Sequence, residues 1–196
     1  MACDSAEPEF WDTRYRQGVT PWDAGRVPSR LARWLAHQST GKRVLVPGCG
    51  SAYEVKLFAE RGDDVLGIDF ADAALEAARR ALGKLADRVR KADFFSFVVP
   101  PFDLVYERTF MCALPPRERG RWARRAAELL RAEGLLAGFF FLADKDRGPP
   151  FGIAARELHA LLDPALALVE DEELPPEQSV PVLAGQERWQ VWERRL

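Results

Sequence analysis

Apolar residues follow two alternating patterns along the chain after about residue 41. Short continuous apolar runs, typical of strands buried on both faces, alternate with longer segments in which apolar residues recur every three or four positions. The runs predict seven strands, at residues 43–46, 64–69, 89–92, 102–106, 135–142, 167–173 and 188–194. The longer segments predict helices at residues 53–61, 72–85, 117–132 and 153–162. This alternation indicates an α/β fold, with a seven-stranded, mostly parallel sheet and helices on both faces.

Particular residues mark the ends of these elements. Asp72 is expected to N-cap the second predicted helix, and Gly62 and Gly134 stand where helix C-caps belong. Pro164 follows the fourth predicted helix as a stop signal. The last predicted strand, residues 188–194, alternates in polarity, which suits an antiparallel strand at the edge of the sheet.

The first 40 residues are aromatic and differ from the rest. Three of the six tryptophans, Trp11, Trp22 and Trp34, fall there. Exposing so many rings to water is unfavourable, so we expect this segment to cover the ligand-binding end of the sheet as a lid. A length of 196 residues with 47% hydrophobic content fits a single domain, residues 1–196, made of a cap (1–40) and a sheet-and-helix part (41–196).

Charge and cysteine content narrow the range of partners. Charged residues make up 30% of the chain but leave a net charge of only −2, so nothing in the balance favours nucleic acid or an anionic membrane. Cys3, Cys49 and Cys112 form no CxxC pair, so we expect no metal site and a reducing compartment. The N-terminus lacks a signal-peptide pattern and no run is long enough to span a bilayer. We therefore expect a soluble cytoplasmic protein that binds a small molecule; its oligomeric state is left open.

Residues 47–53 form the turn after the first predicted strand, where parallel α/β sheets usually bind ligands. Gly48 and Gly50 allow a sharp bend and a close approach of the backbone to a ligand. The third position of a dinucleotide-binding GxGxxG motif is Tyr53, whose ring would obstruct the helix approach that glycine permits. This disfavours a nicotinamide-dependent oxidoreductase, and a plain tight turn is the structural alternative.

The ends of the next two predicted strands carry acidic residues. Asp69, nineteen positions after Gly50, can accept both hydroxyls of a ribose, although it could instead cap the following helix. Asp93 could accept from an adenine amino group, and Phe94 could lie against the base or belong to the core. Polar groups at three successive strand ends favour a nucleoside ligand over coincidence.

The stretches VLVPGCGSAYEV, VLGIDFADAAL, KADFF and FDLVYERTFMCALPP resemble, in order and spacing, a class I S-adenosylmethionine-dependent methyltransferase with a Rossmann-like fold. The similarity is greater to the thiopurine methyltransferase family, which includes thiol, thiocyanate and halide methyltransferases. TPWDAG at 20–25, YERTFMCAL at 106–114 and GPPF at 148–151 are similar to signatures of that family, and the resemblance runs from about Phe10 to the C-terminus.

The resemblance implies S-adenosyl-L-methionine as cofactor and assigns site residues. Gly48 and Gly50 would lie near its methionine part, Asp69 and the adjacent Phe70 at the ribose end, and Asp93 and Phe94 at adenine. The aromatic residues Trp11, Tyr15 and Trp22 would cover cofactor and acceptor, although both tryptophans could be core residues. Glu107 and Arg108 would face cofactor and substrate as the catalytic pair, and GPPF would form a wall of the acceptor pocket, although its prolines could simply stiffen that loop.

Methyl transfer from a sulfonium is an in-line displacement in which positioning dominates. An anionic acceptor such as a thiolate, thiocyanate or halide needs no strong base, which agrees with the placement of His37 and His159 outside the expected site. A neutral oxygen or amine acceptor would need one, and Glu107 is the candidate. The rival hypotheses are a nicotinamide-dependent oxidoreductase and a non-catalytic S-adenosylmethionine-binding domain.

Overall fold

The computed structural model describes residues 4–196, which divide into two compact units. The first unit extends to Phe97 and the second runs from Val98 to Leu196. The predicted cap belongs to the first unit together with three of the strands, so the boundary expected near residue 40 is internal to that unit. A single domain for the whole chain stays a prediction, and Cys3 lies outside the described residues.

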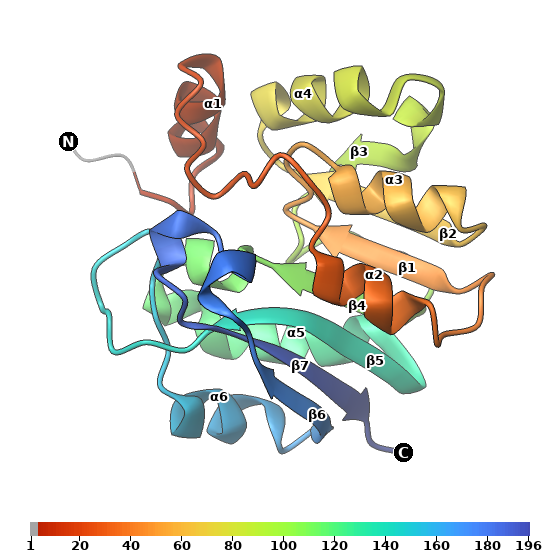
Figure 1. Ribbon diagram of the computed structural model, residues 1–196, viewed down its shortest axis with the longest axis vertical. Coiled ribbons are helices and arrows are strands. Elements are labelled where there is room, and N and C mark those ends of the chain that lie inside the picture. The colour runs from red at the N-terminus through yellow and green to blue at the C-terminus, as the bar shows by residue number, and fades with distance from the viewer. Residues whose placement is uncertain (1–3) are drawn as a thin grey trace. The chain divides into compact units, whose positions relative to one another are not determined.

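The first unit begins with two helices that the apolar pattern did not predict (Figure 1). Its elements, in chain order, are α1 (Pro8–Arg16), α2 (Ser29–Leu35), β1 (Arg43–Pro47), α3 (Tyr53–Glu60), β2 (Asp64–Asp69), α4 (Asp72–Leu82), η1 (Gly83–Arg88) and β3 (Val89–Lys91). The three predicted strands are confirmed to within one residue at each end, and the helix predicted over 72–85 is shorter because the chain turns into η1 at Gly83.

The strands of the first unit bring three loops to one edge. β1 pairs in parallel with β2, with Pro47 opposite Ile68, and β2 pairs in parallel with β3, with Asp69 opposite Lys91. Parallel strands place their carboxyl ends at the same edge of a sheet, which is where α/β folds bind ligands. The chain therefore enters the glycine turn, the β2–α4 connection and the loop after β3 from neighbouring strand ends.

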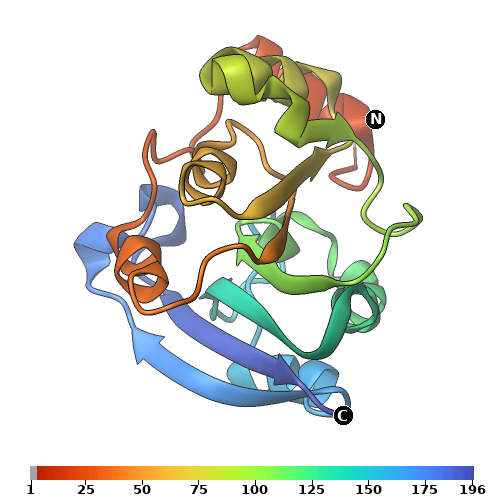
Figure 2. The same cartoon turned by 90° about the vertical axis from the view of Figure 1, so that its right-hand side faces the viewer.

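The second unit contains the remaining four strands. Its elements are β4 (Phe102–Arg108), η2 (Met111–Ala113), η3 (Pro116–Glu118), α5 (Arg119–Leu129), β5 (Leu130–Phe141), α6 (Ala155–Leu162), β6 (Leu166–Glu173), η4 (Pro176–Gln178), η5 (Pro181–Leu183) and β7 (Glu187–Arg194). β4 pairs in parallel with β5, whereas β7 runs antiparallel to both β5 and β6. The two long antiparallel strands β6 and β7 lie side by side in both views (Figure 2).

The seven strands follow the order β3-β2-β1-β4-β5-β7-β6, as expected for a Rossmann-like α/β sheet with mixed strand directions. β7 is antiparallel as predicted, but its position as an edge strand is wrong. It lies between β5 and β6, and Trp189, Gln190, Val191 and Trp192 are all buried. The alternation of polar and apolar residues was misleading because the polar Gln190 is buried with a hydrogen-bond partner. Trp192 Nε1 donates to Gln190 Oε1 over 3.2 Å.

β6 forms the rim of the second unit and carries four acidic residues in succession, at positions 170–173. Arg188 on β7 donates to Asp171 over 2.7 Å and to Glu173 over 2.8 Å. Burial of Asp171 raises its pKa, but hydrogen bonds from Arg188 and Gln190 outweigh this and lower the pKa overall.

Two predicted helix ends are wrong. Gly134 is not a C-cap, because α5 ends at Leu129 and the chain enters β5 directly; a Cβ at Gly134 would lie 2.9 Å from the Arg131 carbonyl oxygen in an irregular part of that strand. Asp72 is not the N-cap of α4, because the capping position is Ala71 and the Asp72 carboxylate is exposed and pairs with Lys91 over 2.7 Å. Gly62 and Pro164 do follow helix ends.

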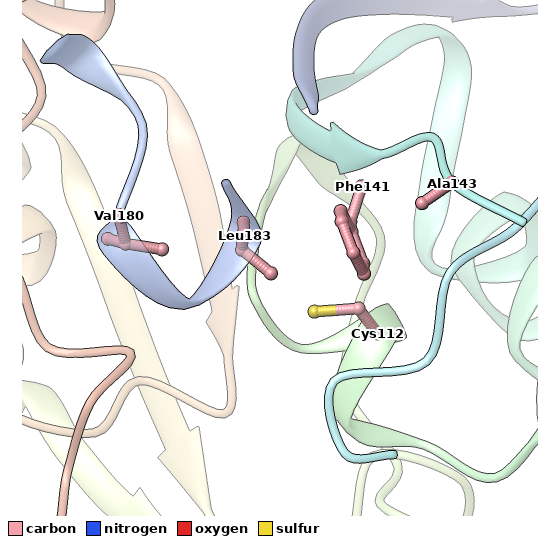
Figure 3. Close-up of a cluster of buried hydrophobic side chains, with 5 residues drawn as sticks. All are labelled: Cys112, Phe141, Ala143, Val180 and Leu183. Carbon is pink, nitrogen blue, oxygen red and sulfur yellow. The ribbon is translucent and has the colours of Figure 1, made fainter. Parts of the chain in front are cut away.

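A small apolar cluster joins three connections of the second unit, and its members are Cys112, Phe141, Ala143, Val180 and Leu183 (Figure 3). Cys112 comes from the loop after β4, Phe141 and Ala143 from the end of β5 and the loop beyond it, and the other two from the loop before β7. The cluster holds these connections together where β4 and β5 end.

Among residues 4–196, no helix is long and apolar enough to cross a membrane.

Candidate functional site

The turn after β1 is built on positive backbone angles. Gly48 has φ +56° and Gly50 has φ +49°, and Ala52 also lies in the left-handed region immediately before α3. A Cβ at Gly50 would stand 2.5 Å from the Tyr15 hydroxyl oxygen, so this position needs glycine for both its backbone angle and its contact. The turn therefore fits tightly beneath a side chain of the N-terminal segment.

Asp69 lies beneath this turn as a buried carboxylate. Its side chain is about 8% exposed; Oδ2 accepts the Gly50 amide over 3.2 Å and Oδ1 accepts the Ala71 amide over 3.0 Å. Each carboxylate oxygen has two lone pairs, so the carboxylate keeps acceptor capacity after these bonds. Burial raises the pKa of Asp69 to about 6 despite hydrogen bonds from the Ala71, Gly50 and Phe70 amides. The helix-capping alternative is thus partly realised, and the ribose contact stays a prediction.

The loop after β3 carries the two residues predicted to contact adenine. Asp93 is exposed and already shapes the loop, with Oδ1 accepting the Phe95 amide over 3.0 Å and Oδ2 accepting the Ser96 hydroxyl over 2.8 Å. Phe94 is buried and packs edge-to-face on Phe95, with ring centroids 5.4 Å apart. Phe70, at the end of β2, is half-buried. The adenine contacts stay a prediction.

Three aromatic side chains of the N-terminal segment contact one another. Trp11 and Trp22 pack edge-to-face with centroids 5.2 Å apart, and Tyr15 and Trp22 do so at 6.0 Å. Trp11 Nε1 donates to the Ser5 carbonyl over 2.8 Å, and Trp22 Nε1 donates to the Tyr15 hydroxyl over 3.5 Å. Burial raises the pKa of Tyr15 well above its usual value, so the phenol is neutral. Both tryptophans are half-buried, whereas Trp34 of the same segment is buried.

The structure brings Tyr15, Gly50 and Asp69 together at the turn. It also shows three polar residues, Asp12, Asp23 and Ser51, that sequence reasoning left without a role and that bond at the turn or at the start of α4. Asp23 accepts the Ser51 hydroxyl over 2.5 Å, and Asp12 accepts the Ala73 amide over 2.7 Å. Asp23 lies inside the TPWDAG stretch, which was a usable signal, but nothing in the sequence pairs Asp12 with a helix 61 residues away.

The alanine substitution at Gly50 should therefore disturb the site more than the backbone alone explains. Gly50→Ala is expected to cost about 1–2 kcal/mol of stability for the positive φ, and to weaken binding of S-adenosylhomocysteine because the methyl group displaces Tyr15. Gly41→Ala is the matched control, since Gly41 has φ +77° and no atom within 4 Å of the added Cβ. Thermal unfolding and calorimetry measure both effects. Wild-type affinity in the Gly50 variant would contradict the assignment of the turn.

In the second unit, Glu107 is a buried acid at the end of β4. Its Oε1 accepts the Phe110 amide over 3.0 Å and the Met111 amide over 2.9 Å, while Oε2 is buried with no hydrogen-bond partner among the described residues. Its side chain is about 2% exposed, and burial raises its pKa to about 8. The carboxyl group is thus mostly protonated at neutral pH. A Cβ at Gly138, opposite on β5, would collide with the Glu107 carbonyl oxygen.

Arg108 follows as a half-buried cation whose guanidinium carbon lies 4.6 Å from the centroid of the Phe139 ring. A guanidinium stacked on an aromatic face is held in place and still carries its charge. Glu107 and Arg108 therefore place a neutral acid and a fixed cation next to each other at the end of one strand.

The GPPF stretch is fastened to the loop after β4. The Phe151 amide donates to the Cys112 carbonyl over 2.7 Å, and the Gly152 amide donates to the Lys145 carbonyl over 2.8 Å. The buried Arg119 donates to the Gly152 carbonyl oxygen.

The Cys112 thiol in the loop after β4 is not a nucleophile at neutral pH. Burial, followed by the nearby Glu107 and Glu187 carboxyl groups, raises its pKa well above the usual range.

The two histidines lie where the sequence predicted, outside the candidate site. His37 is exposed in the connection that follows α2. His159 on α6 packs edge-to-face on Trp192, with centroids 4.9 Å apart, and lies 3.3 Å from the Asp163 carboxylate. Neither is a candidate for acid–base chemistry.

Known proteins resemble this chain in fold and in sequence. A solved structure of 1,6-didemethyltoxoflavin-N1-methyltransferase from Burkholderia thailandensis, with bound 1,6-didemethyltoxoflavin and S-adenosylhomocysteine, superposes with a TM-score of 0.73 at 19% identity, covering 96% of this chain and 87% of the other. Thiocyanate methyltransferase 1 from Brassica oleracea is 30% identical over 97% of this chain and 87% of its own length. Probable thiol methyltransferase 2 from Arabidopsis thaliana is 32% identical over 83% and 76%, respectively.

The strand order, together with the turn after β1, defines the fold class as that of the Rossmann-like class I methyltransferases. The profile of the thiopurine S-methyltransferase family matches residues 6–195, nearly the whole chain. The chain therefore belongs to the thiopurine S-methyltransferase family.

Proposed function

We propose that this protein is a cytoplasmic enzyme that transfers a methyl group from S-adenosyl-L-methionine to a small soft nucleophile, such as a thiol, thiocyanate, a halide or a thiopurine. Family membership supports the reaction, and the names of the plant relatives support the class of acceptor. The observation that carries the proposal is Asp69, a buried carboxylate that organises the glycine turn and keeps acceptor capacity for a ribose.

The residues of the first unit fit such a cofactor. When bound, S-adenosylmethionine supplies a methyl group activated by a sulfonium. Asp69 would accept its ribose hydroxyls, with Phe70 beside them, and the turn holding Gly48 and Gly50 offers close backbone approach to the methionine part. Asp93 and Phe94 would lie near the adenine. The side chains of Trp11, Tyr15 and Trp22 would form an aromatic cover that attracts the cationic sulfonium.

Arg108 is proposed to orient the methyl acceptor, and Glu107 to remove its proton when the acceptor is neutral. A protonated Glu107 adds no negative charge at neutral pH, so the cation of Arg108 can orient an anionic nucleophile. When Glu107 is ionised, its Oε2, which makes no hydrogen bond among the described residues, can take a proton from a neutral acceptor. The same pair thus accounts for anionic acceptors without a base and for neutral ones with a base.

A screen for methylated products tests the proposal. The purified protein is incubated with S-adenosylmethionine and, separately, with iodide, thiocyanate, hydrosulfide and a thiopurine, and products are followed by gas or liquid chromatography. We expect turnover with at least one of these acceptors. Binding of S-adenosylhomocysteine without any turnover would favour a non-catalytic binding domain, and binding of NAD alone would favour an oxidoreductase.

A further inference from the structure

Helix α4 begins directly after the connection that follows Asp69, and it lacks a cap of its own. The residue at its N-cap position, Ala71, has no side chain that can accept a hydrogen bond, and the Asp72 carboxylate is bonded to Lys91 instead. The first amides of a helix have no partner within the helix and need acceptors from elsewhere. For α4, one such acceptor comes from a different helix.

That acceptor is Asp12 of α1. Its Oδ1 accepts the Ala73 amide over 2.7 Å, and its side chain is only about 10% exposed. A carboxylate at a helix N-terminus also gains from the positive end of the helix dipole. α1 lies alongside α4 in both views (Figures 1 and 2). Arg16, one turn further along α1, lies 3.8 Å from the second carboxylate oxygen and is itself exposed.

A second carboxylate fastens the segment to the glycine turn. Asp23 Oδ2 accepts the Ser51 hydroxyl over 2.5 Å, and its Oδ1 accepts the Gly25 amide over 2.7 Å, which fixes the carboxylate within its own loop. Ser51 directly follows Gly50, whose amide bonds to Asp69. The two fastening points therefore lie on the two chain segments that Asp69 holds together, the glycine turn and the start of α4.

The aromatic residues lie between these two points. Tyr15 and Trp22 fall between Asp12 and Asp23 in sequence, and the Tyr15 hydroxyl sits over Gly50. α1 itself has no side-chain cap, and the stretch between the two helices contains positive-φ glycines at positions 18 and 25. The placement of the aromatic cover thus depends on the two carboxylates rather than on regular structure within the segment.

We propose that Asp12 and Asp23 are positioning residues that dock residues 8–28, here called the cap segment, onto the cofactor turn. The proposal rests on the proposed cofactor site and goes beyond it by assigning retention of the cofactor to two residues outside that site. Asp23 bonds to the glycine turn and Asp12 to the start of α4, and both of these segments are also hydrogen-bonded to Asp69. Docking of the cap segment and binding of the cofactor therefore stabilise the same backbone arrangement. By linkage, loss of either contact lowers cofactor affinity, and bound cofactor strengthens the docking.

The test compares Asp12→Ala and Asp23→Ala with the wild-type chain. We expect each variant to bind S-adenosylhomocysteine about fivefold more weakly or worse, mainly through faster dissociation, which stopped-flow tryptophan fluorescence measures. Trypsin supplies a second readout, because Arg16 and Arg26 in the cap segment are exposed. S-adenosylhomocysteine should protect these sites in the wild type and protect them less in the variants.

Conservative variants and a matched control separate docking from general stability. Asp12→Asn keeps an acceptor oxygen for the Ala73 amide and should recover most of the affinity. Asp63→Ala removes another buried aspartate of the same unit, which accepts the Lys42 amide over 3.0 Å and pairs with Arg61 over 2.7 Å. It lies just before β2, away from the carboxyl ends of the strands. The Asp63 variant should lose thermal stability but keep its affinity and its protection from trypsin.

A double-mutant cycle of Asp23→Ala with Ser51→Ala gives the coupling directly, and the double variant should be no worse than either single variant. Wild-type dissociation rates and full trypsin protection in both alanine variants would overturn the docking proposal. Equal losses of affinity in the Asp63 control would overturn it as well, since they would reduce the effect to stability. Absence of S-adenosylhomocysteine binding by the wild-type chain would instead refute the cofactor site itself.

Discussion

Replacing Asp69 with alanine is expected to weaken binding of S-adenosylhomocysteine by about 1.5 to 3 kcal/mol, or roughly 10- to 150-fold. The variant loses charge-assisted hydrogen bonds to the ribose and also releases the Gly50 and Ala71 amides, which the carboxylate holds in the free protein. Titration calorimetry at neutral pH measures the change. Unchanged affinity would refute the ribose assignment.

The pH dependence of binding gives the same residue a second test. The free protein holds Asp69 with a pKa of about 6, and a ribose hydroxyl donates best to the ionised carboxylate. Affinity for S-adenosylhomocysteine should therefore fall below pH 6, by up to about tenfold per pH unit. Binding near pH 6 should release protons, which calorimetry detects by repeating the titration in buffers of different ionisation enthalpy. In Asp69→Asn this part of the pH dependence should disappear.

Replacing Glu107 with glutamine should divide the acceptors into two groups. For a weakly acidic thiol, which is mostly un-ionised in solution near pH 8, Glu107 acts as the base, and kcat/KM should fall by about 10²-fold. For iodide, which has no proton to lose, the variant should stay within a few-fold of wild type. Thiolate already present in solution needs no base and limits this loss, so the thiol must have a pKa well above the assay pH. An equal loss with iodide and thiol would assign Glu107 a role in structure rather than in proton transfer.

Stability provides an independent readout for Glu107. Its pKa is about 8 in the folded chain and near 4.5 in an unfolded one, so the folded state binds the proton more tightly. The stabilisation from this proton is complete below about pH 4.5 and is lost as the pH rises through 8. The melting temperature of the wild type should therefore fall across this range more steeply than that of Glu107→Gln, whose side chain resembles the protonated acid. Parallel curves would contradict the raised pKa.

Local sequence patterns were sufficient where residue types mark both ends of an element. β1 and β2 are short apolar runs flanked by glycine, aspartate or proline, and their bounds could be read within a residue. α5 shows the limit, since its apolar spacing continues past Leu129 although the chain turns extended at Leu130, which pairs with Phe102 of β4. Pairing with a distant strand decided that boundary, and no short window of sequence contains it.

The candidate site shows the same division between local and distant causes. Gly50 and Asp69 could be identified because their residue types and spacing reflect the backbone geometry of the turn and the ligand chemistry proposed for it. The cap of α4 could not, because Asp12 supplies it from another helix while the obvious candidate, Asp72, faces solvent and Lys91. The raised pKa of Glu107 was equally invisible, since it follows from burial that only the folded chain creates.

The row of acids on β6 has a consequence for solubility. An unpaired strand edge invites another polypeptide to add to the sheet, and natural proteins often block such self-assembly with charge. Here any incoming strand would meet four consecutive carboxylates, at positions 170–173, with Arg188 balancing two of them from the inner side. This barrier is electrostatic, so we expect it to weaken as acid protonates the carboxylates.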